Sequence, residues 1–213
     1  MNNDLNKMLK LYDDPIVDKE LRSLSKEFIS TYWLCDNDLE NYWLPLKNII
    51  FKSESKDIPD LMFNSSFELI VQRGGILFSK EEYSALQNCM RIAGDTYFVL
   101  IENKFTRNTE ADFPHLRFKF PIETTWEELN NGDENFPDIS FETIFIMNKH
   151  FFVFGDSGKW GKYAASDYKY TPLDIIGFKT ELATIFHKNF KQPKKEQEEV
   201  WKWLPQEYKK LIK

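Results

Sequence analysis

A Gly-Asp-Ser-Gly tetrapeptide at positions 155–158 is the stretch of this sequence that most resembles a catalytic motif. The same four residues surround the nucleophilic serine of certain serine proteases, where a histidine base held by a carboxylate activates the hydroxyl. None of the three histidines, His115, His150 and His187, lies in a second motif of such an enzyme. We therefore do not expect Ser157 to act as a nucleophile.

The spacing of the relevant residues disfavours both a phosphate-binding loop and a metal site. A phosphate-binding loop has four residues between its outer glycines and a Ser or Thr after its lysine, but five residues separate Gly155 from Gly161 here and Tyr163 follows Lys162. No histidine has another histidine or a cysteine at the spacing of metal ligands. We predict a non-enzymatic protein without cofactor or metal, and the alternative is an enzyme of unknown class with a pocket near the Gly155–Gly161 loop.

An acidic segment of the sequence indicates a surface for binding a partner and not a catalytic site. From Ile122 to Glu142 the sequence has seven acidic residues and no Lys or Arg. Acidic side chains can replace phosphates on a basic protein and speed its association. A solvated acidic face is the more common explanation of such a run. Glu127 and Glu128 also have a local role, because negative charge stabilises the start of a helix.

Trp160 is a second candidate for recognition, and two interpretations of it stay open. Asp156 and Ser157 can hydrogen-bond to their own loop, which would make a rigid turn that presents an aromatic side chain. An exposed Trp160 would anchor a partner, whereas a buried one would plug the end of a sheet. The predicted partner-binding residues are Glu127, Glu128, Asp133, Glu134, Asp138, Asp156 and Trp160.

Composition favours one folded domain with a core rich in aromatic rings. The chain has 213 residues, of which 42% are apolar and 16% aromatic, including 19 Phe. The two cysteines, Cys35 and Cys89, lie in apolar stretches, so we expect buried thiols in a reducing compartment and no disulfide framework. No signal-peptide core and no apolar window of about 18 residues is present, so we expect a cytoplasmic protein without a membrane partner.

The charge is unevenly distributed. The net charge is −6, which disfavours nucleic acid as a partner. Residues 188–213 have eight Lys and four Glu, so residues 1–187 have a net charge of −10. We expect residues 1–191 to form a single α+β domain, and residues 192–213 to form a basic amphipathic helical tail packed on it, with Pro205 splitting its helix.

Short apolar runs with β-branched or aromatic residues predict the strands. They lie at 49–51, 66–72, 76–78, 96–102, 116–120, 144–147, 151–154, 162–165 and 174–178. We expect hairpins between 66–72 and 76–78 and between 144–147 and 151–154, and a strand, tight loop and strand across Gly155–Gly161. Strand 116–120 alternates apolar and basic residues, which predicts one face in water.

Helices are predicted from apolar periodicity and capping residues. They begin at Asp14-Pro15, after a turn at Asp36–Asp38, at the capping box of Ser79 and Glu82 (ending at Gly94), at a second capping box of Thr124 and Glu127, and at Lys179. Together with the strands, this order predicts a central antiparallel twisted sheet flanked by N-terminal, middle and C-terminal helices.

The loop and the strand after it also carry a family resemblance. Gly155–Tyr163, Asp167 and Pro172–Phe178 resemble a run in small bacterial proteins, and the element order over roughly residues 66–190 is similar to the SUKH superfamily of immunity proteins. The resemblance implies an α+β protein that neutralises a toxin of a competing bacterium by binding it, without catalytic residues. We therefore expect an immunity-type inhibitor that covers a basic toxin domain through its acidic surface. A regulatory subunit that docks through its C-terminal helix is another alternative.

Overall fold

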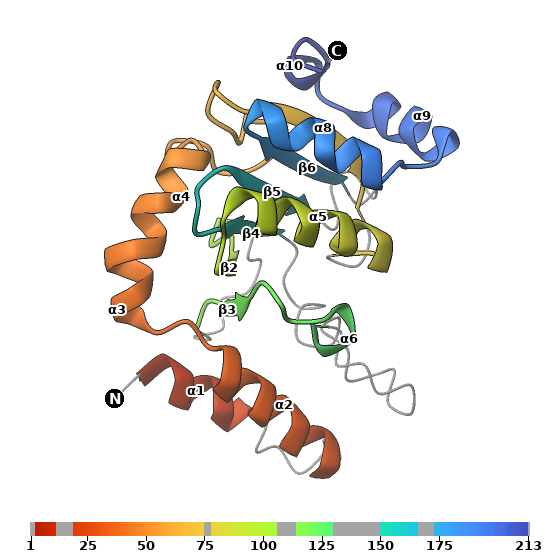
Figure 1. Ribbon diagram of the computed structural model, residues 1–213. Helices are drawn as coiled ribbons and strands as arrows, with labels where there is room; N and C mark the ends of the chain where they lie inside the picture. Colours follow the sequence, from red (N-terminus) through yellow and green to blue (C-terminus); the bar gives the residue numbers. More distant parts are fainter. Residues whose placement is uncertain are drawn as a thin grey trace.

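Six antiparallel strands form one sheet in the order β1-β6-β5-β4-β2-β3. Figure 1 shows this sheet in the computed structural model, with helices on both of its sides. The strands are β1 Glu68–Arg73, β2 Tyr97–Glu102, β3 Arg117–Pro121, β4 His150–Gly155, β5 Trp160–Ala165 and β6 Leu173–Phe178. The predicted α+β class with a central antiparallel sheet is therefore confirmed.

The structure describes residues 3–11, 19–74, 78–105, 114–129, 150–165 and 173–212. The predicted helix start at Asp14-Pro15, the predicted strand 144–147 and the acidic residues Asp133, Glu134 and Asp138 lie outside these ranges. The helices are α1 Asn3–Leu11, α2 Lys19–Tyr32, α3 Asp36–Asp38, the π-helical η1 Leu39–Trp43, α4 Leu44–Ile50, α5 Lys80–Ala93, α6 Trp126–Leu129, α8 Thr180–Asn189, α9 Lys194–Trp203 and α10 Gln206–Lys209. None of them is long and apolar enough to cross a lipid bilayer.

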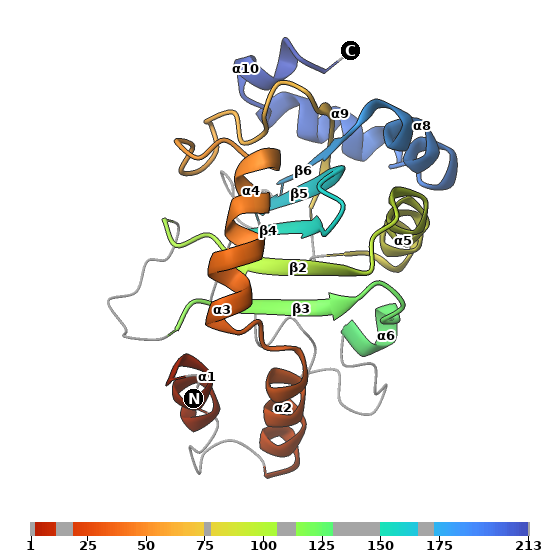
Figure 2. The same ribbon diagram turned by 60° about the vertical axis from the view of Figure 1, so that its left-hand side comes forward.

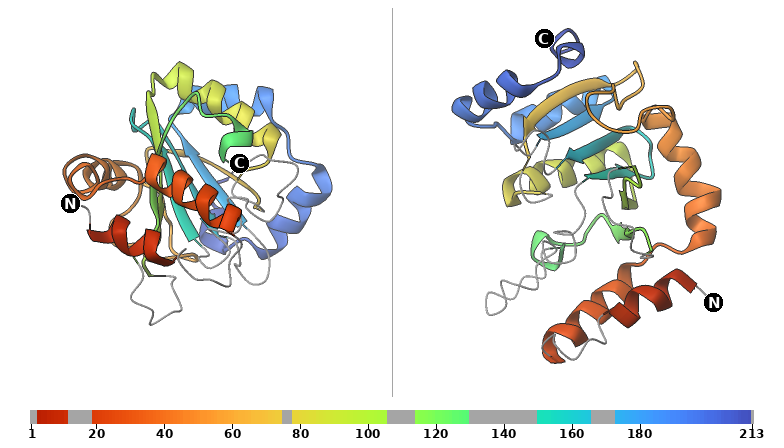
Figure 3. Two further views of the ribbon diagram at one scale, coloured as in Figure 1. Left: turned by 90° about the horizontal axis from the view of Figure 1, so that it is seen from below. Right: turned by 180° about the vertical axis from the view of Figure 1, so that it is seen from behind.

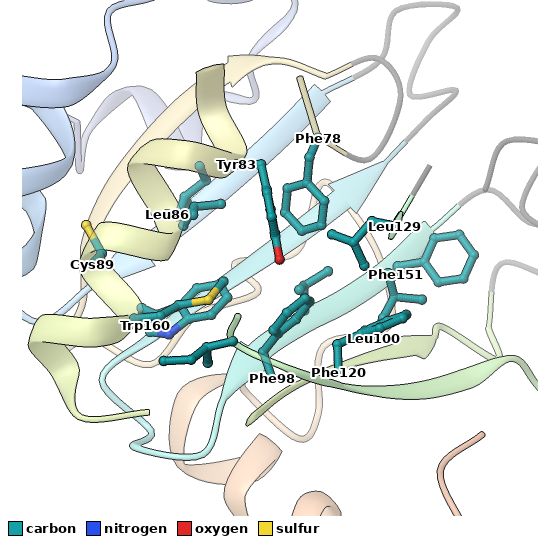
Figure 4. Close-up of a cluster of buried hydrophobic side chains, with 14 of the residues drawn as sticks. Phe78, Tyr83, Leu86, Cys89, Phe98, Leu100, Phe120, Leu129, Phe151 and Trp160 are labelled. Carbon is teal, nitrogen blue, oxygen red and sulfur yellow. The ribbon is translucent and has the colours of Figure 1, made fainter. Parts of the chain in front are cut away.

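Hydrophobic cores lie on both faces of the sheet. All six residues of β4, of β5 and of β6 are buried. On one face, the side chains of α5 and α8 pack on sheet residues such as Phe98 and Trp160, and Figure 4 shows the aromatic rings gathered there. On the other face, Trp43 and Ile50 pack on residues such as Phe154, and Figure 2 shows α3 to α4 crossing this face. Every side chain of the central strands therefore faces protein.

The strand, loop and strand predicted around the glycines are confirmed as the hairpin of β4 and β5. Gly158 has a φ of 66°, a left-handed conformation that glycine adopts without strain. Gly155 faces the carboxylate of Asp95, and a Cβ atom at this position would overlap it. Glycines at these two positions therefore allow the loop to close tightly against the end of α5.

Strand β1 pairs with β6, and residues 75–77, on which the predicted hairpin at Gly74 depends, lie outside the described ranges. The register runs from Glu68 opposite Phe178 to Arg73 opposite Leu173. The local glycine pattern resembled a hairpin turn, but residues about a hundred positions later supply the partner. As a result β1 is an edge strand, and the right panel of Figure 3 shows it (amber) at the edge of the sheet next to α9.

The face of β3 that was expected in water is only partly in water, because Arg117 is buried, Lys119 is partly exposed and Pro121 is exposed. Arg117 is buried, and its guanidinium contacts Asp4 of α1 and Asp36 of α3. Lys119 Nζ lies 3.5 Å from a carboxylate oxygen of Asp38. The basic side chains alternate as predicted, but the N-terminal helices cover them and provide carboxylates to neutralise them.

Three further local predictions differ from the structure. Asp36–Asp38 begins the helical run that continues through η1 and α4, where acids favour a helix start, and is not a turn before it. That run reaches Ile50, so the predicted strand 49–51 is replaced by a single bridge between Phe51 and Phe63. The cap of α6 is formed by Thr125 and Glu128, one residue later than predicted.

The C-terminal tail packs on the face of the sheet that carries α4. Val200, Leu204 and Tyr208 are buried with residues of β6 and with Met62. Tyr208 Oη accepts a hydrogen bond from Met62 N at 2.9 Å and donates one to Asp60 O at 2.6 Å. Pro205 separates α9 from α10, as predicted. The tail therefore contributes to the core, besides contacting β1.

We predict that Tyr208→Phe lowers the free energy of unfolding by about 1–3 kcal/mol, because it removes the hydrogen bond to Asp60 O and leaves the buried donor Met62 N without this partner. Urea denaturation measures the change. The control is Tyr42→Phe, which removes one hydrogen bond of 3.3 Å to Asp156 O at the surface and should cost much less. Equal unfolding midpoints of the two variants would contradict the structural role of the tail.

Candidate functional site

Trp160 is fully buried, so the interpretation as a plug at the end of the sheet is confirmed and the exposed anchor is wrong. Its indole Nε1 donates a hydrogen bond to Asp95 Oδ2 at 2.7 Å, and Ser157 N donates one to Asp95 Oδ1 at 2.6 Å. Asp95 follows the end of α5. The indole and the loop are thus fixed to one buried carboxylate, and Trp160 belongs to no contact surface.

The carboxylate of Asp156 is also used within the loop. Its two oxygens accept hydrogen bonds from Thr96 N at 2.9 Å and Tyr97 N at 3.2 Å, at the start of β2. Ser157 Oγ accepts from Lys159 N at 3.3 Å. Among the described residues no histidine contacts Ser157, because His150 bonds to Asp57 on the other side of the sheet. The polar groups of the loop therefore stabilise its conformation and join it to β2, which is a structural role.

The acidic residues around α6 that the structure describes have local partners. Glu127 lies 2.5 Å from Lys80 Nζ, and the two groups are exposed. Glu123 lies 2.7 Å from Arg91, and Glu128 accepts a hydrogen bond of 2.6 Å from Thr125 N. Hydrogen bonds to these basic groups lower the pKa of Glu123 and of Glu127. The basic residues of α5 therefore neutralise part of the predicted acidic surface.

The two cysteines differ in environment. Cys89 is buried, as predicted, and burial raises the pKa of its thiol to about 12. Cys35 is exposed, which corrects the expectation of a buried thiol. It is the N-cap residue of α3 and has an extended backbone, and its neighbour Leu34 is buried while its own side chain is not.

A buried cluster of charges on β5, α5 and β6 was not predicted. Lys162 Nζ lies 2.6 Å from Glu82 Oε1 and 2.7 Å from Asp174 Oδ2, and all three side chains are at most 5% exposed. The ring of Phe78 lies 4.8 Å from the ammonium. Glu82 keeps only half of its predicted capping role, because its backbone N donates to Ser79 Oγ while its carboxylate turns to Lys162.

The cluster contains two carboxyl groups and one ammonium group, and burial affects the pKa of each of them. Desolvation raises the pKa of Glu82 to about 7, although Lys162 opposes the change. Desolvation also raises the pKa of Asp174. Desolvation alone would lower the pKa of Lys162, but the attraction of Asp174 and Glu82 outweighs it and raises that pKa. The cluster is thus net negative when both carboxyls are ionised and neutral when Glu82 holds a proton.

Two adjoining hollows open beside this cluster. The first, called here the edge groove, has a volume of about 540 Å³ and runs along β1 between α8 and α9. The second, called here the Gln72 cleft, has a volume of about 450 Å³ and lies between β1, the start of α5 and Trp126. Gln72, Phe190 and Gln192 line both. The hollows therefore form one continuous concave surface at the end of the sheet.

The backbone of β1 is open towards the edge groove. In an antiparallel pair, alternate residues direct their N–H and C=O groups away from the partner strand. Within the described ranges, Gln192 Nε2 donates to Arg73 O at 3.4 Å, and no other hydrogen bond reaches the outer side of β1. Leu69, Ile70 and Val71 are only half-buried. In the described part of the chain, an unpaired strand edge thus forms the floor of a groove with both polar and apolar walls.

Another polar network lies on the opposite face of the sheet. Asp57 Oδ1 is 2.8 Å from His150 Nδ1 and accepts a hydrogen bond of 2.6 Å from the Tyr163 hydroxyl. Asn103 donates to the same hydroxyl at 2.7 Å and to Lys56 O at 2.6 Å. Burial and Asp57 raise the pKa of Tyr163. The network joins the loop around Asp57 to the sheet.

We predict that Glu82→Gln reduces the pH dependence of stability. The pKa of Glu82 is about 7 in the folded protein against 4.5 ordinarily, so the folded state binds more protons between these values. Stability from this carboxyl is complete below pH 4.5 and is lost as the pH rises through about 7. Urea unfolding from pH 5 to pH 8 should show this loss in the wild type and in the control Glu81→Gln, but much less of it in Glu82→Gln. Parallel profiles of all three proteins would contradict the burial of Glu82.

The comparisons with known proteins leave the family open. A scan against protein-family models, a search of curated proteins and a search of solved structures found no match for this chain.

Proposed function

We propose that the protein is a binding protein that takes up an extended segment of a partner protein along β1. The observation that carries the proposal is the unpaired edge of Glu68–Arg73 at the floor of the edge groove. Edge strands expose a row of backbone donors and acceptors that pair readily with another chain, and natural proteins usually cover or charge them. Here the edge is flanked by two helices that leave it accessible from one side.

The groove has the dimensions and the polarity that strand addition needs. Six residues of β1 extend for about 20 Å, enough to pair with a segment of similar length. Backbone hydrogen bonds supply affinity in this mode of recognition, and alternate side chains enter pockets that supply specificity. The ionisable residues that line the groove are Glu68, His187 and Lys191. Because glutamines also line it, a segment that combines apolar and polar side chains fits it best.

Trp201 of α9 is the strongest candidate for an anchor. It lines the groove and is 46% exposed, whereas most large apolar residues of the chain are buried. Large aromatic residues dominate the energy of many interfaces. The basic C-terminal tail that the sequence singled out thus takes part in recognition by forming one wall of the groove.

We further propose that the partner is a basic toxin domain and that the protein is an immunity-type inhibitor. The resemblance to the SUKH superfamily is one support, and the net charge of −6 is the other, because a negative protein attracts a basic one over long range. We assign the attraction of the basic partner mainly to Asp133, Glu134 and Asp138. Glu127 and Glu128 contribute less, since they have partners within the chain.

We predict that Trp201→Ala weakens binding to groove-directed peptides at least tenfold, as expected for a central aromatic contact. The peptides are selected from a displayed library of random linear sequences, and affinity is measured by fluorescence titration. The matched control is Trp203→Ala, which is equally exposed on α9 but does not line the groove. Failure to select any peptide, or an equal loss in both variants, would count against the groove.

For the toxin, we expect that the protein binds the product of a toxin gene next to its own gene and that the association rate falls steeply with salt. Charge reversal at Asp133, Glu134 and Asp138 should slow association more than reversal at Glu127 and Glu128. Surface plasmon resonance at several salt concentrations measures the rates. Association that is independent of salt would remove the electrostatic part of the proposal.

A further inference from the structure

We infer that the Gln72 cleft binds a guanidinium group, and that in the complex this group is an arginine side chain of the strand seated on β1. That the arginine belongs to a strand on β1 rests on the proposed function. That the cleft binds a guanidinium group follows from the residues of the cleft alone. Three features of the cleft support it: buried amide oxygens without hydrogen-bond partners among the described residues, carboxyl groups in its lining, and aromatic side chains in its walls.

The acceptors come from two glutamines. Gln72 is 2% exposed, and its Oε1 atom is buried without a hydrogen-bond partner among the described residues. The Gln72 amide favours the charged forms of both Glu82 and Asp174, so its N–H₂ group faces these carboxylates and its oxygen faces elsewhere. The amide orientation is therefore fixed by the charges beside it.

Gln192 supplies a second acceptor in the same way. Its Nε2 donates to Arg73 O at 3.4 Å, while its Oε1 is buried and has no partner within the described part of the chain. Both glutamines line the cleft. An unpaired buried acceptor destabilises the protein, and a ligand that donates a hydrogen bond to it removes this penalty.

Charge and aromatic rings point to a cation with several N–H groups. Glu196 lines the cleft, and no described side chain forms an ion pair with it, whereas the basic residues of the rim, Arg73 and Lys80, are paired with Glu199 and Glu127. The carboxyl of Glu82, which lines the cleft above Lys162 and Asp174, adds negative charge when it is ionised. The aromatic lining is formed by Phe78, Trp126 and Phe190. A planar guanidinium with five donors suits such a site, since it can both donate to the oxygens and stack on rings.

The register of β1 explains how a partner would deliver this group. Gln72 lies opposite Asp174 on the sheet face that carries α5. On a strand added beside β1, the residue opposite Gln72 directs its side chain to the same face. An arginine at that position reaches the cleft while its neighbours in the segment occupy the edge groove.

The test uses the full chain and a small probe, Nα-acetyl-arginine N-methylamide, with the neutral citrulline analogue as its isostere. In a ¹H–¹⁵N NMR titration, the side-chain amides of Gln72 and Gln192 and the indole N–H of Trp126 should shift with the arginine probe. The citrulline probe should bind at least tenfold more weakly, because it lacks the charge. Equal affinities of the two probes, or no shift at these three groups, would overturn the inference.

A pair of variants separates the cleft from general surface charge. Glu196→Gln should weaken binding of the arginine probe several-fold, because it removes a carboxylate at the cleft. Glu198→Gln is the control, since Glu198 lies on the same helix, pairs loosely with Lys194 and does not line the cleft. An equal loss in both variants would overturn the inference. Peptides that bind the groove without preferring arginine would refute the cleft alone, whereas arginine binding without any groove peptide would refute only the proposed function.

Discussion

The ion cluster of Lys162, Glu82 and Asp174 is the interaction on which the arrangement around the edge strand depends. It joins β5, the start of α5 and β6 through contacts of 2.6 and 2.7 Å in a region from which water is excluded. Removal of one partner from a buried pair leaves an uncompensated charge, which is strongly destabilising. Because the central strands are covered on both faces, Lys162 can reach water on neither side. The carboxylates from α5 and β6 are therefore required for β5 to occupy its place.

The edge of the sheet follows from this arrangement. β6 carries Asp174 and pairs with β1, which has no further strand beside it among the described residues. The helices α8 and α9 cover the two faces near β1, but the hydrogen-bonding edge between them remains open. The same elements thus produce a rigid core and an accessible strand. Such an edge can be used for binding, whereas the Asp156 carboxylate of the Gly155–Gly161 loop is used in hydrogen bonds to β2, which is why we propose function at the edge.

Local signals in the sequence were sufficient for elements whose contacts are local. The hairpin of β4 and β5 follows from its glycines, and α5 follows from the Ser79 cap and from Gly94, whose φ is 84°. Long-range pairing was not accessible from local signals, because the partner of β1 at Leu173–Phe178 lies about a hundred residues later in the sequence. The site was missed for the same reason. Lys162 alternates with Trp160 and Ala164, which was a signal of inward orientation, but its partner Glu82 was explained by the helix cap alone.

Hydrogen exchange at β1 tests the central claim most directly. Of the amides in Glu68–Arg73, those that point to β6 should exchange slowly in the free protein, and the alternate ones that point outward should exchange fast. When the tightest groove-directed peptide, or the partner itself, is bound, the account predicts strong protection of the outward amides with little change elsewhere. Unchanged exchange at β1, or protection confined to α6 and its surroundings, would contradict binding at this edge.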